Sequence, residues 1–285
     1  MKRIIGVVGP TGVGKTCISV KLAKAIDAEI INCDSVQVYK ELNIGSAKIK
    51  EEEKENIPHH LFDIKEIDEE YTIYDYQKDA REIIDNTDKQ IIFVGGSGLY
   101  LRAALYDYQL NTNKIHNDYS KYSLDELYNM ALKLDKNLSI DKNNRQRIER
   151  FLDKKANNEE IVNDSKPIYD FILIGLTTNR DTLYDRINLR VDKMFEEGLL
   201  NEVEELYKKN KNSKILNSAI GYKELIPYIE GKYSLDEAKE LIKRNSRRFA
   251  KRQYTFFNNQ FNVKWFEVNN IDDTLKEILD YLKNN

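Results

Sequence analysis

The segment 9–16 has the composition of a phosphate-binding loop. It reads Gly9-Pro10-Thr11-Gly12-Val13-Gly14-Lys15-Thr16 and fits the pattern G-x-x-x-x-G-K-[ST]. Glycines let backbone N–H groups curl around phosphate oxygens, and a helix that follows presents unpaired N–H groups and the positive end of its dipole. Lys15 adds a positive charge, and the Thr16 hydroxyl is a candidate ligand for Mg²⁺. The loop predicts a phosphorylated ligand but does not specify a nucleotide.

A carboxylate is expected beside this loop. Asp34 follows the apolar run 28–33, and ligands of open parallel sheets lie outside the carboxyl ends of the strands. Asp34 would then face the same crevice as Lys15, where it could act as a general base or a metal partner. The alternative is an aspartate that only caps a turn or a helix. Cys33 precedes Asp34, and Cys17 follows the loop. Both cysteines are interpreted as small core residues rather than nucleophiles.

A second glycine cluster, Gly95-Gly96-Ser97-Gly98, follows the apolar run 90–94 and should line the same crevice. Neither this run nor the run before the loop ends in the acidic residue that many P-loop phosphotransferases use to hold Mg²⁺. This argues against an ordinary ATPase. The pair His59-His60 lacks further ligands at a metal-binding spacing, so we interpret it as structural.

Basic residues are concentrated in two segments. Six of the ten residues in 243–252 are basic, and four of them share one helix face at i, i+3, i+4 and i+7: Arg244, Arg247, Arg248 and Lys251. The second segment is 145–150. Because the whole chain carries a net charge of −3, segregated basic helices favour the backbone of RNA or DNA. The alternative is a solvated helix face.

The elements that must position these residues alternate between strand and helix. Strands are predicted at 4–8, 28–33 and 90–94, and helices at 16–26, 72–86 and 99–106. This order predicts an α/β fold, a P-loop NTPase-like parallel sheet flanked by helices. Continuous apolar runs fit strands that are buried on both faces.

The middle of the chain shows no strand pattern. Segment 111–163 carries helical patterns at 123–134 and 144–152 and is predicted to be a small all-helical insertion domain. The core would then comprise 1–110 and 164–285. Its second part is predicted to contain a strand at 169–175, helices at 180–195, 199–208, 222–229 and 235–257, an edge strand within 261–268 and a last helix at 271–283.

Composition excludes several classes of protein. The 285 residues are 41% hydrophobic, enough for a sizeable core in one large domain or two unequal ones. No apolar run reaches ~18 residues, which argues against a membrane span. Two cysteines cannot form a disulfide framework, so we expect a cytoplasmic protein.

Together these segments resemble the tRNA dimethylallyltransferase family, the isopentenyl transferases that modify adenosine beside the anticodon. The order of DSVQVYK, GGSGLYL and AKRQ is far more specific than the loop alone. Ser97 and Ser246 stand where threonine is usual, and Phe256 replaces the usual tryptophan. The matching segments are GPTGVGKT (9–16), DSVQVYK (34–40), SAK (46–48), PHHLFD (58–63), GGSGLYL (95–101), RQRIER (145–150), RVDKMFEEGLLNEV (190–203), IGYKE (220–224) and SRRFAKRQYTFF (246–257).

The resemblance implies a reaction. A dimethylallyl group would pass from dimethylallyl diphosphate to the N6 amine of a flipped-out adenosine 37 in the tRNA anticodon stem–loop. The loop, with Lys15, Thr16 and the cofactor Mg²⁺, would neutralise charge on the departing diphosphate. The enzyme would act as a monomer without a membrane partner, and the insertion would grip the anticodon arm.

The resemblance also implies roles for individual residues. Asp34 would be the general base, and Thr11 and Ser97 would help place the diphosphate and the tRNA. Lys223 and Arg247 would be further cationic partners of the diphosphate. The tRNA-contacting residues would be Ser35, Val36 and Gln37 at the base, and Gln146, Arg147, Ile148, Glu149 and Arg150 in the insertion.

Two other functions share part of this evidence. A nucleoside or nucleotide kinase would have the same loop and sheet, and the residues alone do not separate it from a prenyl transferase. A non-catalytic, phosphate-gated RNA-binding module would have no use for a carboxylate beside the loop, so Asp34 discriminates against it.

Overall fold

The computed structural model describes residues 4–108, 117–157 and 166–285. The chain divides into two compact units, one comprising Met1–Tyr106 with Pro167–Asn285 and the other Asp107–Lys166. The boundaries predicted for the insertion, at 110/111 and 163/164, fall outside the described residues.

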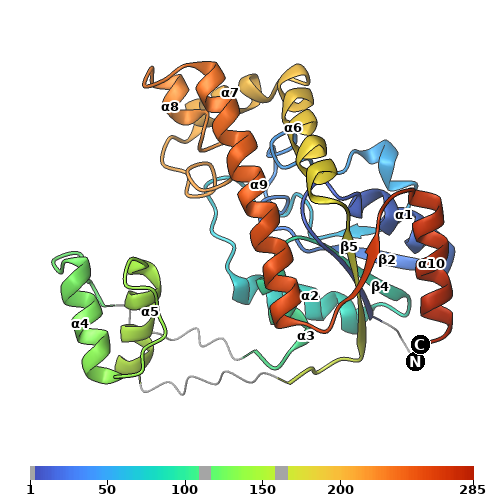
Figure 1. Cartoon of the computed structure of the whole chain (residues 1–285), viewed down its shortest axis with the longest axis horizontal. Coiled ribbons are helices and arrows are strands. Elements are labelled where there is room, and N and C mark those ends of the chain that lie inside the picture. Colours follow the sequence, from blue (N-terminus) through green and yellow to red (C-terminus); the bar gives the residue numbers. More distant parts are fainter. Residues whose placement is uncertain (1–3, 109–116, 158–165) are drawn as a thin grey trace. The chain divides into compact units, whose positions relative to one another are not determined.

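The larger unit is built on a six-stranded sheet in the order β3-β2-β4-β1-β5-β6 (Figure 1). All five strand pairings are parallel. The strands are β1 (Ile4–Val8), β2 (Ala28–Asn32), β3 (His59–His60), β4 (Gln90–Gly95), β5 (Phe171–Thr177) and β6 (Lys264–Glu267). The predicted α/β fold class is confirmed.

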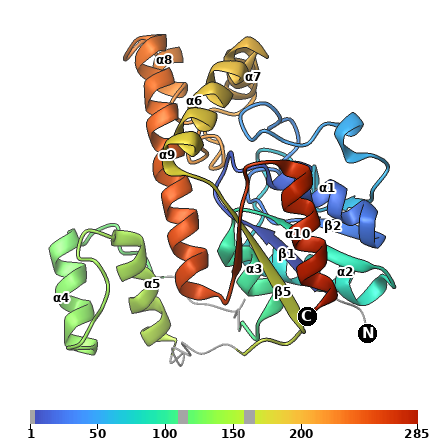
Figure 2. The same cartoon turned by 45° about the vertical axis from the view of Figure 1, so that its right-hand side comes forward.

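Helices cover both faces of this sheet. One face is covered by α1 (Lys15–Ile26) and α10 (Ile271–Lys283), and the other by α2 (Ile73–Asn86) and α3 (Gly98–Leu105) (Figure 2). After β5 come α6 (Arg180–Glu196), α7 (Leu199–Lys209), α8 (Ile226–Ile229) and the long α9 (Leu235–Gln260). No helix in the described part of the chain is long and apolar enough to span a membrane.

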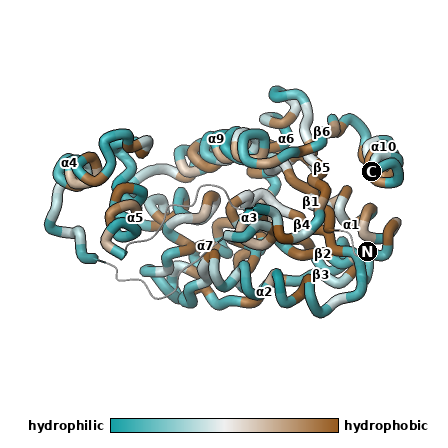
Figure 3. Tube along the Cα trace, turned by 90° about the horizontal axis from the view of Figure 1, so that it is seen from below, coloured by the Kyte–Doolittle hydropathy of each residue, from teal (hydrophilic) through white to brown (hydrophobic). Residues whose placement is uncertain are grey.

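The strand residues alternate between two hydrophobic cores. Ile5 and Val7 of β1 belong to the core under α1 and α10, whereas Ile4 and Val8 belong to the core under α2 and α3. The four inner strands β1, β2, β4 and β5 are therefore mostly apolar and lie in the interior of the molecule (Figure 3). This double burial explains why their sequences are continuous apolar runs without a polar face.

Two segments differ from their predicted structure. The predicted helix 222–229 contains α-helix only at Ile226–Ile229. Pro227 lacks the N–H that a longer helix would need here, and Gly221 at φ 96 turns the chain before it. The short elements β3 and η1 (Glu51–Lys54) were not predicted, because two to four residues carry no readable periodicity.

The histidine pair lies in β3 and makes structural contacts. His60 Nε2 lies 2.8 Å from Glu29 Oε2, and His59 Nδ1 lies 2.7 Å from the Ile57 carbonyl oxygen. Within 4–108, 117–157 and 166–285, no group of three or more His, Cys, Asp or Glu side chains is arranged to hold a metal. These contacts agree with the structural interpretation of the pair.

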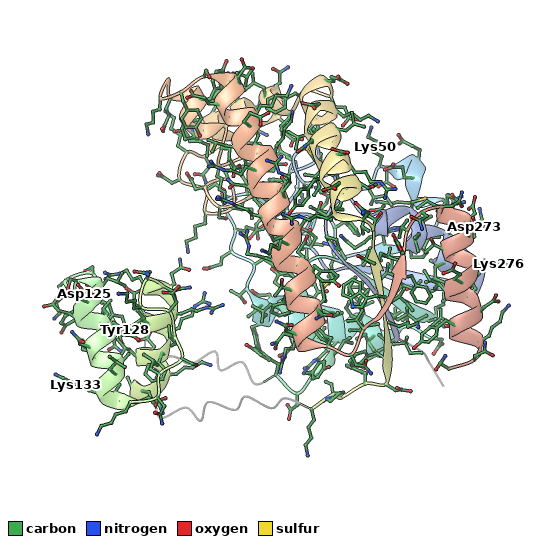
Figure 4. The ribbon with its side chains drawn as sticks, in the orientation of Figure 1. Lys50, Asp125, Tyr128, Lys133, Asp273 and Lys276 are labelled. Carbon is green, nitrogen blue, oxygen red and sulfur yellow. The ribbon has the colours of Figure 1, made fainter. Side chains whose placement is uncertain are left out.

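The smaller unit contains a helix pair, α4 (Leu124–Leu134) and α5 (Arg145–Ala156). The Ser123 hydroxyl caps α4 by accepting a hydrogen bond from the Glu126 N–H. In return, the Glu126 carboxylate accepts a hydrogen bond from the Ser123 N–H. Asp125 and Lys133 project away from the unit (Figure 4). Its small core consists of Leu127, Ala131, Ile148, Phe151 and Leu152.

Candidate active site

The phosphate-binding loop joins β1 to α1, as its sequence predicts. Gly12 and Gly14 adopt φ values of 82° and 102°, the left-handed region in which a side chain is strained. Gly14 is the residue before α1, so its conformation aims the N–H groups of the first helical turn toward the loop. Thr16 lies exposed in that turn.

A cavity of about 810 Å³ opens beside the loop, within the larger unit. Its walls come from the loop, segment 34–37, segment 45–47, segment 218–223 and α9. The predicted site residues that line it are Thr11, Gly12, Gly14, Lys15, Thr16, Asp34, Ser35, Val36, Gln37 and Lys223. Residues separated by as much as two hundred positions therefore meet at one surface.

Lys15 stands at the centre of the loop. Its ammonium donates hydrogen bonds to the Gly9 and Pro10 carbonyl oxygens, both at 2.9 Å. Burial, followed by the positive charge of Arg190, lowers the pKa of Lys15 to about 8, and the Asp34 carboxylate opposes this shift. Lys15 is therefore a desolvated cation, which attracts an anion more strongly than a solvated one.

Arg190 is a second cation at the loop, and its role was not predicted. It reaches from α6 into the cavity wall, and its Nη1 donates to Thr11 Oγ1 at 3.3 Å. Burial lowers the pKa of Arg190, and the nearby Asp34 carboxylate raises it. Lys15, Arg190 and Asp34 thus form an electrostatically coupled group. The matching segment 190–203 was the only signal for Arg190, because no spacing rule relates it to Thr11.

Arg247, which was predicted beside the diphosphate, makes a hydrogen bond to α6. Its guanidinium donates to Asn188 Oδ1 at 2.5 Å, and it is not among the described residues that line the cavity. The reason is the packing of α6 against α9, which also engages Lys243 with Asp192 at 2.9 Å. Of these two arginines, Arg190 is the one that lines the cavity in the described part of the chain.

Asp34 closes a turn and also lines the cavity, so it fits both the turn-capping and the functional interpretation of the sequence. Its Oδ1 accepts a hydrogen bond from the Val36 N–H at 2.9 Å, which closes a turn, and its own N–H donates to Asn32 Oδ1 at 3.0 Å. In the described part of the chain, the other carboxylate oxygen has no hydrogen-bond partner, and Asp34 lines the cavity. One oxygen therefore holds the turn, while the other is available to a ligand.

Gln253 of α9 connects the two glycine clusters. Its Oε1 accepts the Thr11 N–H at 2.9 Å, and its amide packs so tightly on Gly96 that a Cβ there would lie 1.7 Å from Gln253 Nε2. A side chain at position 96 would therefore displace the Gln253 amide that holds Thr11. No role was predicted for Gln253, although it lies in the matching segment 246–257.

This chain is similar to known proteins over most of its length. The model of the IPP transferase family matches residues 37–260. This chain belongs to the IPP transferase family. It is 43% identical to the tRNA dimethylallyltransferase of Anoxybacillus flavithermus over 99% of this chain and 96% of that protein. The identity to the corresponding protein of Bacillus licheniformis is 42%, over 98% and 96% of the two chains.

Solved structures of IPP transferases also resemble this chain. The full-length tRNA isopentenylpyrophosphate transferase of Bacillus halodurans is 38% identical, with a TM-score of 0.79 over 100% of this chain and 96% of that one. A eukaryotic dimethylallyltransferase, described as acting on tRNA, is 26% identical with a TM-score of 0.83 over 100% and 80%. The predicted family is confirmed, and with it the class of enzyme.

In this IPP transferase, Ser97 forms hydrogen bonds with residues next to the cavity. Its Oγ accepts the Ser35 N–H at 3.2 Å, and its N–H donates to the Cys33 carbonyl oxygen at 3.0 Å. It is absent from the described cavity lining, as are Gly9, Pro10 and Val13 of the loop. Ser97 therefore joins the ends of β2 and β4 and sets the position of Ser35.

The cysteines differ from each other. Cys33 is buried, and burial raises the pKa of its thiol to about 12, so it is an inert packing residue as predicted. Cys17 is exposed and lines the cavity. Its prediction as a small core residue is wrong, because its position in α1 faces the cavity rather than the sheet.

The predicted tRNA-contacting residues of the smaller unit separate by helix face. Gln146, Arg147 and Arg150 are exposed on α5. Ile148 is fully buried in the core of that unit, and Glu149 accepts a hydrogen bond from Arg145 Nε at 2.7 Å. The structure thus leaves three of the five residues available to RNA and assigns Ile148 and Glu149 to the fold.

The residues beside the loop fit Mg²⁺ with few protein ligands. The Thr16 hydroxyl lines the cavity. Mg²⁺ typically keeps several waters and binds substrate phosphates together with one or two protein oxygens. Such a donor set suits an ion that arrives with a diphosphate rather than a metal held by a protein cage.

Proposed function

We propose that this IPP transferase moves a dimethylallyl group from dimethylallyl diphosphate to the N6 amine of adenosine 37 in tRNA, and releases diphosphate. The observation that carries the proposal is the placement of Lys15, Arg190 and Asp34 around one cavity. The cations suit a diphosphate, and the carboxylate suits an amine that must lose a proton. The names of the relatives support tRNA as the acceptor.

The reaction needs one bond to form and one to break. The N6 lone pair attacks C1 of the dimethylallyl group, and the C1–O bond breaks with its electron pair staying on the diphosphate. The N6 proton passes to the free oxygen of Asp34, which restores a neutral amine.

Positive charge at the leaving group lowers the barrier. Lys15, Arg190 and the N–H groups at the start of α1 would stabilise the negative charge that grows on the diphosphate. Thr16 would hold Mg²⁺ with the diphosphate oxygens, and the ion supplies further positive charge when bound. Thr11 is held between Arg190 and Gln253, which keeps this part of the loop in place.

The acceptor side would use segment 34–37 and exposed basic residues. Ser35, Val36 and Gln37 line the cavity next to Asp34, where an extruded base would enter. Lys223 also lines the cavity and remains a candidate cation for either substrate. Phosphate contacts are proposed for exposed residues of two helices: Gln146, Arg147 and Arg150 of α5, and Arg244, Arg248 and Lys251 of α9.

The proposed enzyme works in the cytoplasm as a monomer. Lys15, Asp34, Gln37 and Arg190, which the proposed mechanism uses, all line one cavity of a single chain. A gel-filtration or sedimentation measurement of the active protein tests the oligomeric state.

A labelled-donor assay tests the reaction. The protein is incubated with dimethylallyl diphosphate labelled in the prenyl group and an unmodified anticodon stem–loop carrying adenosine 37. Label is expected in this RNA and not in a matched stem–loop with guanosine 37. A parallel arm uses γ-labelled ATP and nucleosides; phosphoryl transfer there, without prenyl transfer, would establish the kinase alternative.

A further inference from the structure

Segment 43–47 forms a wall of the cavity and holds the side chain of Gln37. Gly45, Ser46 and Ala47 line the cavity. Gln37 Nε2 donates to the carbonyl oxygens of Ser46 at 3.0 Å and Ala47 at 3.3 Å. Both partners are acceptors, so only the nitrogen of the Gln37 amide can face them.

The orientation of this amide has a chemical consequence. With both N–H bonds directed at segment 43–47, Gln37 Oε1 points away from it, and in the described residues Oε1 has no hydrogen-bond partner. Gln37 lines the cavity three residues from Asp34, so its unpaired acceptor is available to a ligand there. An acceptor at this position favours a base that presents an exocyclic N–H and disfavours one that presents a carbonyl oxygen.

Glu202 of α7 holds segment 43–47 in place. Its carboxylate accepts the N–H groups of Asn43 at 3.2 Å, Ile44 at 2.9 Å and Gly45 at 3.1 Å. It also accepts the Tyr222 hydroxyl at 2.7 Å. Charge-assisted hydrogen bonds of this kind are about twice as strong as neutral ones.

Tyr222 completes the attachment through packing. It is fully buried, and a Cβ on Gly45 would lie 2.6 Å from its ring. The backbone of the segment is thus pressed against the Tyr222 ring while Glu202 binds its N–H groups. Without the carboxylate, three backbone donors would lose their partner at once.

We propose that Glu202 is a positioning residue for the acceptor base. It holds segment 43–47 so that the carbonyl oxygens of Ser46 and Ala47 orient the Gln37 amide, with Oε1 toward the exocyclic amine of the base. Glu202 itself does not line the cavity in the described residues, so it acts through Gln37. The inference rests on the proposed function and adds a specificity device to it.

A double-mutant cycle tests the inference. Glu202→Gln, Gln37→Ala and the double variant are compared in single-turnover prenyl transfer to the anticodon stem–loop. Glu202→Gln should lower kcat/KM for the RNA roughly 10- to 100-fold, the scale expected for a displaced positioning group, with KM for dimethylallyl diphosphate unchanged. In the Gln37→Ala background the same change should have an effect within about 2-fold. Glu205→Gln, an exposed glutamate of the same helix, is the matched control.

The possible outcomes separate this inference from the proposed function. Wild-type protein without prenyl transfer would refute the proposed function. Active wild type with equal losses from Glu202→Gln in both backgrounds would overturn only the role through Gln37. A Glu202→Gln variant that fails to fold by circular dichroism is replaced by Tyr222→Phe, which removes one donor and keeps the ring. Its smaller loss in kcat/KM must also disappear in the Gln37→Ala background, or the inference fails.

Discussion

Replacement of Asp34 by asparagine separates the two functions of this side chain. Asparagine retains the Oδ1 atom that accepts the Val36 N–H at 2.9 Å, so the turn should survive. The second oxygen becomes an amide nitrogen, which cannot take a proton. If Asp34 is the base, the chemical step should slow by ~10²–10⁴-fold, which corresponds to roughly 3–5 kcal/mol of activation free energy.

The structure also predicts how Asp34→Asn changes binding. The Asp34 carboxylate raises the pKa values of both Lys15 and Arg190, so it is close enough to repel an anionic ligand. Its neutralisation removes this repulsion, so the affinity for inorganic diphosphate should be equal or higher. A slower reaction with undiminished diphosphate affinity is the signature of a lost base.

The assay combines single-turnover rates at saturating enzyme with calorimetric titration of inorganic diphosphate. Asp34→Ala is a second variant, because it also removes the turn hydrogen bond and should cost an additional ~1 kcal/mol of unfolding free energy. Asp68→Asn, at an exposed position, controls for the loss of one negative charge. A rate for Asp34→Asn near that of the wild type would reduce Asp34 to a turn-capping residue and refute the mechanism.

Three further predictions concern the cations. The pKa of Lys15 falls from 10.5 to about 8 on folding, so the folded state disfavours its charge and unfolding free energy should rise between about pH 8 and 10.5, by at most roughly 3 kcal/mol. Urea titrations should show this rise in the wild type relative to Lys15→Met, and equal pH profiles would contradict it. Arg190→Ala should lower kcat/KM for dimethylallyl diphosphate roughly 10²- to 10³-fold. Arg247→Ala should mainly lower the melting temperature. A larger loss of kcat/KM from Arg247→Ala than from Arg190→Ala would place Arg247 in the phosphate site. Arg147→Ala and Arg244→Ala should each reduce the slope of log affinity for tRNA against log salt by roughly 0.7–0.9, measured by filter binding, and unchanged slopes for both would make these helices solvated faces.

Much of the fold could be predicted because its signals are contiguous. Strands 4–8, 28–33 and 90–94 are apolar without interruption, and the loop after the first strand carries its own glycines and Lys15. The structure forms these elements within one or two residues of the predicted ends. Local backbone preference and hydrophobic periodicity act over short stretches, so they can be read without tertiary contacts.

Helix faces were less predictable. The spacing of Arg244, Arg247 and Arg248 places them on one side of α9, but the sequence does not say which side α6 covers. The packing of α6 turns Arg247 toward Asn188 and leaves Arg244 and Arg248 exposed. Ile148 faces the core for the same reason, although it lies between basic residues.

The sequence by itself determined that this chain has a phosphate loop, a carboxylate at a neighbouring strand end and the motifs of its family. Only the tertiary structure showed that Arg190 and Gln253 converge on Thr11, and that Glu202 holds the segment that orients Gln37. Arg190, Gln253 and Glu202 each lie more than 150 positions along the chain from the residues that they contact. Their contacts arise from the order of the strands and the packing of α6, α7 and α9, which no local pattern encodes.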